Sequence, residues 1–148
     1  MGDKTIILDV EYLCSEEKIT RRLELLEEQT LDDLHEAIIY HAFGWDDPHM
    51  YAFYMDNKSY SKNHKMEYAS HPEGDGFTSE KQNSTETKLK NLKLEKKQKF
   101  LFVFDFGDDH MFSIKVKDFS ETKEGTKYPT ILEENGKAPE QYPDYDEE

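Results

Sequence analysis

The chain has 148 residues, a formal net charge of −14 and a hydrophobic fraction of 35%. This length predicts one domain that buries its core without disulfides, and the negative charge argues against a general nucleic-acid-binding surface. The only cysteine, Cys14, excludes an intrachain disulfide framework and fits a reducing compartment. Because the sequence has neither a signal-peptide pattern nor an apolar run of membrane length, we expect a cytoplasmic protein without membrane contact.

Two alternating segments open the chain, residues 5–12 and residues 19–26. Both place apolar and polar side chains in turn, as strands with one buried face do. A short polar link joins them, so we predict an antiparallel hairpin. The buried face of the first segment consists of Ile6, Leu8, Val10 and Tyr12.

A helix is predicted next, beginning after Thr30. Threonine is a good N-cap, and the acidic residues that follow favour the positive end of the helix dipole. Apolar residues recur at helical spacing up to Ala42, and Gly44 is a natural stop. His35 and His41 lie near the apolar face, where we interpret them as core or rim residues rather than ligands.

The later part of the chain alternates strands with irregular segments. Residues 49–55 predict a third strand, and residues 56–84 are polar, so we expect a flexible insertion there. Residues 128–132 predict a last short strand, and an acidic tail follows at about 133–148. The whole chain, 1–148, is thus predicted to be a single domain.

The most apolar stretch contains the predicted central strand, residues 99–106. Because apolar side chains fall on both of its faces, we expect it in the middle of the sheet. With a strand also at 110–116, the order of elements predicts an α+β fold. Its parts are a mixed or mainly antiparallel sheet and an N-terminal β-hairpin followed by one main helix, a β-grasp-like opening.

The turn after the central strand is the most informative local feature. If Gly107 and Asp108 are its two central residues, glycine at the first position suits a type II′ hairpin. Asp105 would then lie directly opposite His110. On a half-buried face, the carboxylate should stabilise the charged imidazole and raise the pKa of His110.

The same turn supplies the strongest group of potential metal ligands: Asp105, Asp108, Asp109 and His110. Carboxylates and an imidazole suit hard or catalytic cations. Asp and Gly also gather in turns for conformational reasons alone. A metal at Asp105, Asp108 and His110 and an ordinary turn therefore both stay open, and no cofactor is expected.

Several blocks of the sequence, in this order and spacing, resemble the plasmid pRiA4b ORF-3-like family, also labelled transposon-passenger TnpR-like. The resemblance covers most of the chain outside 56–84. The blocks are Thr30–His35, Ala42–Trp45, His49–Phe53, Asp105–Asp109, Tyr128–Pro129 and Gly136–Tyr142.

The resemblance implies a compact α+β fold and an association with plasmids and mobile elements, without a mechanism. Many members read Asp-Phe-Gly-Asp-x-Trp-x-His, whereas here the Trp position is His110 and the His position is Phe112. Many members also continue with Pro-x-Glu-Asp, whereas here the segment Pro139–Tyr142 lacks one carboxylate. These departures weaken any metal or acid–base site carried over from the family.

Three functions follow from these observations, and we favour a non-catalytic role over an enzymatic one. The first is a binding or adaptor domain with a protein partner. The sequence does not indicate the oligomeric state. The second is a metal-dependent hydrolase or nuclease that uses the Asp105/Asp108/Asp109/His110 cluster. The third is nucleic-acid binding through the lysine-rich segment Lys81–Lys99, which the net charge disfavours. The candidate binding residues are Trp45, His49, Tyr51, Asp105, Asp108, Asp109, His110 and Tyr142.

Overall fold

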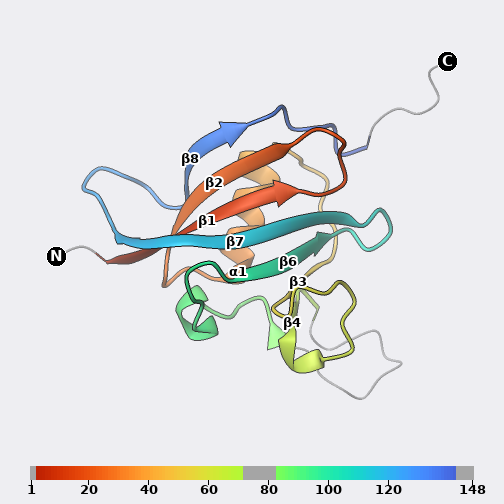
Figure 1. Cartoon of the computed structure of the whole chain (residues 1–148), viewed down its shortest axis with the longest axis horizontal. Helices are drawn as coiled ribbons and strands as arrows, with labels where there is room; N and C mark the ends of the chain where they lie inside the picture. Colours follow the sequence, from red (N-terminus) through yellow and green to blue (C-terminus); the bar gives the residue numbers. More distant parts are fainter. Residues whose placement is uncertain (1–2, 72–82, 143–148) are drawn as a thin grey trace.

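The computed structural model describes residues 3–71 and 83–142. One sheet of eight strands, in the order β5-β4-β3-β6-β7-β1-β2-β8, forms the body of the molecule (Figure 1). Neighbouring strands run antiparallel except for the parallel pair β4–β5. The strands are β1 (Lys4–Tyr12), β2 (Ile19–Leu26), β3 (Tyr51–Tyr54), β4 (Glu67–Ala69), β5 (Asn83–Ser84), β6 (Lys99–Phe104), β7 (His110–Glu121) and β8 (Thr130–Asn135).

The α+β class predicted from the sequence is wrong. The main helical segment is one helix of 12 residues, in which α1 (Leu31–Glu36) continues as the π-helix η1 (Ala37–Ala42). The remaining helical pieces among the described residues are the 3₁₀ turns η2 (His64–Met66) and η3 (Leu89–Leu92). With eight strands in one mixed sheet, the described part of the chain is mostly sheet rather than a balance of helix and strand.

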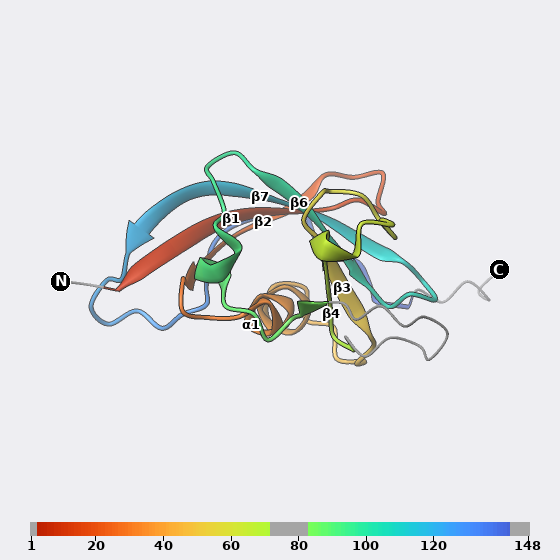
Figure 2. The same cartoon turned by 90° about the horizontal axis from the view of Figure 1, so that it is seen from below.

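The N-terminal hairpin and the helix build the main core. β2 pairs along its whole length with residues 5–12 of β1, and Thr30 caps α1 through a capping box with Asp33. The helix lies beneath the arch of the sheet (Figure 2) and buries Leu31, Leu34 and Ile38 against it. Each buried leucine or isoleucine side chain contributes about 1.5–3 kcal/mol relative to an exposed one, so this face fixes the helix on the sheet.

β6 is apolar on both faces because both are covered. Phe100, Phe102 and Phe104 belong to the main core, on the side of the helix. Leu101 and Val103 belong to a second, smaller cluster on the opposite side of the sheet. The strand ranks fourth of the eight, so its burial on both faces follows from a position inside the sheet.

The two-residue turn predicted between β6 and β7 is wrong. Phe104, not Asp105, is the partner of His110, and the loop spans residues 105–109. Asp105 leaves the strand with φ 65°, and its Oδ1 accepts hydrogen bonds from the backbone N–H groups of Gly107 (3.1 Å) and Asp108 (3.4 Å). Aspartate tolerates this left-handed conformation, and the hydrogen bonds of its side chain stabilise the turn. From residue types alone, the turn had been attributed to Gly107.

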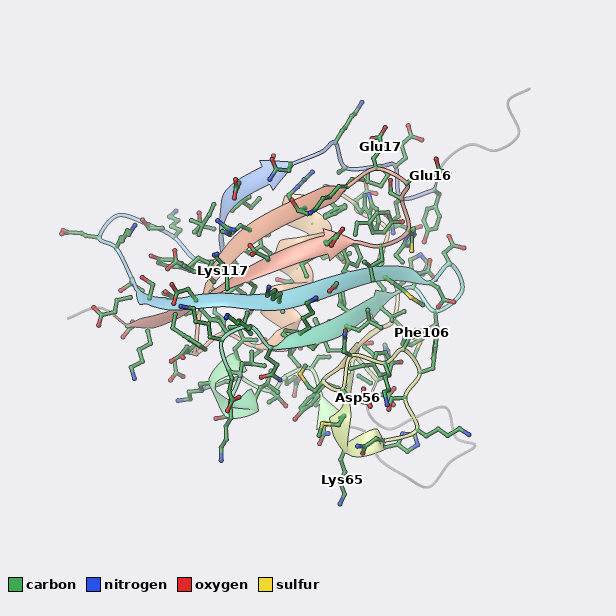
Figure 3. The ribbon with its side chains drawn as sticks, in the orientation of Figure 1. Glu16, Glu17, Asp56, Lys65, Phe106 and Lys117 are labelled. Atoms are coloured by element: carbon green, nitrogen blue, oxygen red, sulfur yellow. The ribbon has the colours of Figure 1, made fainter. Side chains whose placement is uncertain are left out.

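Several chain segments meet at this end of the sheet. In Figure 3 the labelled Glu16 and Glu17, in the turn between β1 and β2, lie at the same end of the molecule as Phe106. The Cys14 Sγ donates a hydrogen bond to the Asp109 carbonyl (3.4 Å), which ties this turn to the β6–β7 loop. Gly136, after β8, passes so close to Lys18 that a Cβ there would lie 2.6 Å from the Lys18 carbonyl oxygen.

The expected insertion at 56–84 contains regular structure in its described part, namely η2, β4 and β5. Residues 72–82 lie outside the described chain, as do residues 143–148 of the expected acidic tail. The described beginning of that tail is ordered structure: β8 ends at Asn135, and the chain continues along the end of the sheet to Tyr142. The last strand of the described chain, Thr130–Asn135, is therefore later and longer than the predicted segment 128–132.

Candidate functional site

Three segments that are distant in sequence come together at the β6–β7 loop. They are the loop itself with the first residue of β7 (105–110), residues 45–49 and residues 139–142. The Trp45 indole Nε1 donates to the Pro139 carbonyl (2.8 Å). The Gln141 amide donates to the Asp47 carbonyl (2.9 Å) and accepts from the Asp47 backbone N–H (3.2 Å). These bonds hold the C-terminal segment against the exit of the helix and bring Tyr142 over the loop.

Asp105 is the centre of this arrangement. Its Oδ2 accepts a hydrogen bond from the Tyr142 hydroxyl (2.6 Å) and lies 3.6 Å from Nε2 of His49. Burial acts to raise the pKa of Asp105, but the hydrogen bonds from Tyr142 and the loop backbone and the charge of His49 hold it below its usual range. The side chain therefore carries a negative charge at neutral pH although it is only 8% exposed.

His49 and Tyr142 form the exposed side of the site. The Tyr142 hydroxyl also contacts Nε2 of His49, and the same nitrogen lies 3.6 Å from an Asp47 carboxylate oxygen. Burial and the hydrogen bond to Asp105 raise the pKa of Tyr142, so its hydroxyl stays protonated and acts as a donor. Tyr142 remains 42% exposed, which leaves its ring open to an incoming molecule.

His110 forms the buried side of the site. Its ring packs against Trp45, with 4.6 Å between ring centroids, and its Nδ1 hydrogen-bonds the Tyr12 hydroxyl (2.9 Å). Its Nε2 makes no hydrogen bond of normal geometry with any described residue, although the Gln141 backbone is near enough to favour the charged ring. Burial lowers the pKa of His110 and outweighs the opposing charges of Asp108 and Asp105. The predicted rise in its pKa is thus wrong, since the carboxylate is not its strand partner and desolvation dominates.

Among the described residues, Asp105, Asp108 and His110 form a group that could hold a metal ion. One ligand atom of each lies within 4.8 Å of the others, and Asp108 is exposed while the other two are buried. We refer to Asp105, Asp108 and His110, together with His49 and Tyr142, as the loop-end site.

The other predicted residues are not members of this site, although Trp45 borders it. Trp45 is buried and supports His110 from below. Tyr51 points toward the helix, where its hydroxyl donates to Asp32 (2.7 Å). Asp109 accepts a hydrogen bond from the Tyr60 hydroxyl and is not part of the metal-ligand group. The convergence thus includes His49, Asp105, Asp108, His110 and Tyr142.

Three residues that support the site were not predicted from the sequence to belong to it: Tyr12, Asp47 and Gln141. Tyr12 was expected on the buried face of β1, but the pattern did not indicate that its hydroxyl would reach His110 across the sheet. The amide of Gln141 makes two hydrogen bonds to the backbone of Asp47. The sequence signal, an amide between Glu140 and Tyr142, does not by itself distinguish a structural clamp from a solvated residue.

Elsewhere, a hollow of about 550 Å³ lies on the face of the sheet opposite the helix. Five basic and three acidic side chains line it, and two of these carboxylates pair with Arg22: Asp9 (2.7 Å) and Glu133 (3.2 Å). In the lysine-rich segment, Lys88 and Lys90 pair with Glu28 and Lys96 pairs with Asp118, while Lys81 lies outside the described residues. Nucleic-acid binding by Lys81–Lys99 stays a prediction that no contact in the structure strengthens.

The second buried histidine, His35, belongs to the core. Its ring stacks on Tyr51 at 3.7 Å between centroids and lies 5.5 Å from Phe104. Neither ring nitrogen has a hydrogen-bond partner within the described part of the chain. Burial lowers the pKa of His35 to about 4, against a smaller opposing effect of Asp32. It therefore sits in the core as a neutral aromatic ring, as the sequence indicated for a histidine on the apolar face.

The fold and the site define a protein built on one mostly antiparallel sheet, with a polar cluster at the end of two central strands. The chain belongs to the plasmid pRiA4b ORF-3-like protein family, whose model matches residues 4–143. The crystal structure of a protein of unknown function, MM3350 from Methanosarcina mazei Go1, is similar. Its sequence is 26% identical and its TM-score is 0.73, with 95% of this chain and 75% of that chain covered.

No curated protein matched the chain in a search. No helix in the described ranges is long and apolar enough to cross a membrane.

Proposed function

We propose that this protein is a binding domain and that its loop-end site recognises a positively charged group. The observation that carries the proposal is the composition of the converging segments. Residues 45–49, 105–110 and 139–142 contain no lysine or arginine, and they carry Asp46, Asp47, Asp105, Asp108, Asp109 and Glu140. Such a grouping of acidic side chains attracts and orients a cation.

The geometry supports binding because the polar groups are held in place before a ligand arrives. Two backbone N–H groups and the Tyr142 hydroxyl fix the carboxylate of Asp105. The imidazole of His110 is clamped between Tyr12 and Trp45. A preorganised site loses less conformational entropy on binding, so a few groups can give useful affinity.

The exposed rim favours a protein as one source of the charged group. Met50 and Tyr142 are 45% and 42% exposed, and Met50 accepts the backbone hydrogen bond of Asp105 (2.9 Å). Methionine and tyrosine are enriched in protein interfaces, where they surround charged contacts. This supports an adaptor role in which a partner protein presents a lysine or arginine to the loop-end site. Any link to mobile elements would depend on which protein that partner is.

The only tryptophan of the chain, Trp45, offers a direct assay because it packs under His110. Its fluorescence is followed during titration with argininamide, the chlorides of Mg²⁺, Ca²⁺, Mn²⁺ and Zn²⁺, sodium acetate and sodium phosphate. We expect a saturable change with at least one cation and none with the anions. Asp108→Asn should weaken that response, whereas Glu16→Gln, which removes an exposed charge from the β1–β2 turn at the same end, should not.

The opposite pattern contradicts the proposal. If no cation changes the emission, or if acetate and phosphate act as strongly as the cations, the site does not select positive charge. Equal weakening by Asp108→Asn and Glu16→Gln would mean that the overall charge of the molecule, and not this site, attracts the cation.

A further inference from the structure

We infer that the loop-end site is a binding site for a divalent transition-metal ion, with Asp105, Asp108 and His110 as its protein ligands. This inference rests on the proposed function and specifies the chemical class of the cation. The starting observation is the Nε2 of His110, a buried ring nitrogen that makes no hydrogen bond of normal geometry with a described residue.

His110 is 7% exposed, and its Nε2 is a buried atom without a hydrogen-bond partner of normal geometry among the described residues. An unpartnered buried polar atom costs about 1–3 kcal/mol, so such atoms call for a ligand or another explanation. The other ring nitrogen, Nδ1, is already bonded to Tyr12. Nε2 is therefore the nitrogen of His110 that is left for a ligand.

The neighbours of His110 make that ligand a cation. Ligand atoms of Asp105, Asp108 and His110 lie within 4.8 Å of one another, a spacing that one ion with bonds of about 2.0–2.3 Å can bridge after small side-chain adjustments. The loop positions both carboxylates: Asp105 is fixed by its own hydrogen bonds to the loop backbone, and Asp108 lies three residues on in the same turn. Asp108 is exposed, which leaves an entry path.

The donor set selects among metals. Two carboxylates and one imidazole suit Mn²⁺, Zn²⁺ and their neighbours in the first transition row, whereas Mg²⁺ and Ca²⁺ prefer oxygen ligands alone. The Tyr12 hydroxyl on Nδ1 orients the ring, as the outer partners of metal-bound histidines do.

The test is a metal titration of the full chain after removal of bound ions with a chelator. Calorimetry with ZnCl₂ and MnCl₂ should give one site per chain, and MgCl₂ and CaCl₂ should bind at least about tenfold more weakly. Addition of CoCl₂ should produce visible absorption bands from a site with nitrogen and oxygen ligands. Saturation with Zn²⁺ at 100 times its Kd should also stabilise the fold, by about 2.7 kcal/mol in urea unfolding.

Two variants and one control assign the site. Asp108→Asn removes an exposed ligand and should weaken Zn²⁺ binding by tenfold or more, and His110→Gln should abolish the cobalt bands. Glu16→Gln should bind as the native chain does. Circular dichroism checks that each variant is folded, and Asp108→Asn keeps the test decisive if the buried His110 variant does not fold.

The possible failures are distinct. If argininamide changes the Trp45 emission in a way that depends on Asp108 while Zn²⁺, Mn²⁺ and Co²⁺ do not bind, the metal assignment falls and the proposed recognition of positive charge stands. If neither metals nor argininamide bind, both fall. If Zn²⁺ binds equally to the native chain and to Asp108→Asn, the ion occupies other surface groups and the assignment is overturned.

Discussion

Stability at mildly acidic pH should depend on one core residue, His35. Its pKa is about 4 in the folded chain, compared with about 6.5 for an unperturbed histidine. As the pH falls below 6.5, the unfolded chain takes up a proton that the folded chain does not, so the free energy of unfolding decreases until the pH reaches the folded pKa. These two pKa values give a loss of about 2 kcal/mol between pH 7.5 and pH 5 and of about 3 kcal/mol by pH 4.

The perturbation is His35→Phe, which removes the titrating nitrogens and keeps an aromatic ring between Tyr51 and Phe104. Urea unfolding followed by Trp45 fluorescence measures the free energy of unfolding at pH 7.5, 6 and 5. Carboxylates also titrate in this range, so the quantity of interest is the difference between the two proteins. We expect the native chain to lose about 2 kcal/mol more than His35→Phe on going to pH 5.

The control is His41→Gln, which removes an exposed histidine from the same helix and should leave the native pH dependence unchanged. The reasoning is refuted if His35→Phe keeps the full pH dependence of the native chain. It is equally refuted if NMR titration of the folded protein finds the His35 ring protonating near pH 6.5.

Two further predictions concern the segment that closes the loop-end site, both measured as urea unfolding midpoints. Gly136→Ala should destabilise the fold by about 1–3 kcal/mol more than Gly125→Ala. Both glycines have φ near +82°, but only at Gly136 would the new Cβ collide with a backbone oxygen. Equal losses in the two variants would show that backbone conformation alone sets the cost. Gln141→Ala should cost about 1–3 kcal/mol because it breaks both hydrogen bonds to the Asp47 backbone. The neighbouring exposed Glu140→Ala should have little effect, and a similar loss in the two variants would deny Gln141 its role as a clamp.

Strong local patterns predicted the parts of the fold that depend on local rules. The alternation in β1 and β2, the Thr30 cap and the two apolar faces of β6 are properties of short segments, and each one has the expected place in the structure. The fold class could not be obtained in the same way. β4 and β5 are three and two residues long, and such short strands form because a neighbouring strand offers hydrogen bonds, not because their own residues alternate.

The candidate site shows the same limit. Asp105, Asp108 and His110 are close in sequence, so a local pattern was sufficient to group them. Their geometry was not predictable, because the left-handed conformation of Asp105 lengthens the loop and moves His110 opposite Phe104. Tyr142 was a candidate binding residue from the sequence, but its hydrogen bond to Asp105, 37 positions away, depends on the path of the C-terminal segment, which no local pattern predicts.

The two edges of the sheet bear on how the molecule behaves at high concentration. An edge strand presents unpaired backbone groups that can recruit another chain and begin a fibre. β5, at one edge, is two residues long, and β8, at the other, carries the exposed Glu133 and Glu134 and meets β2 through a register shift. Two copies that paired through β8 would bring like charges together. The described sheet thus ends at both sides in strands that are poor templates for aggregation.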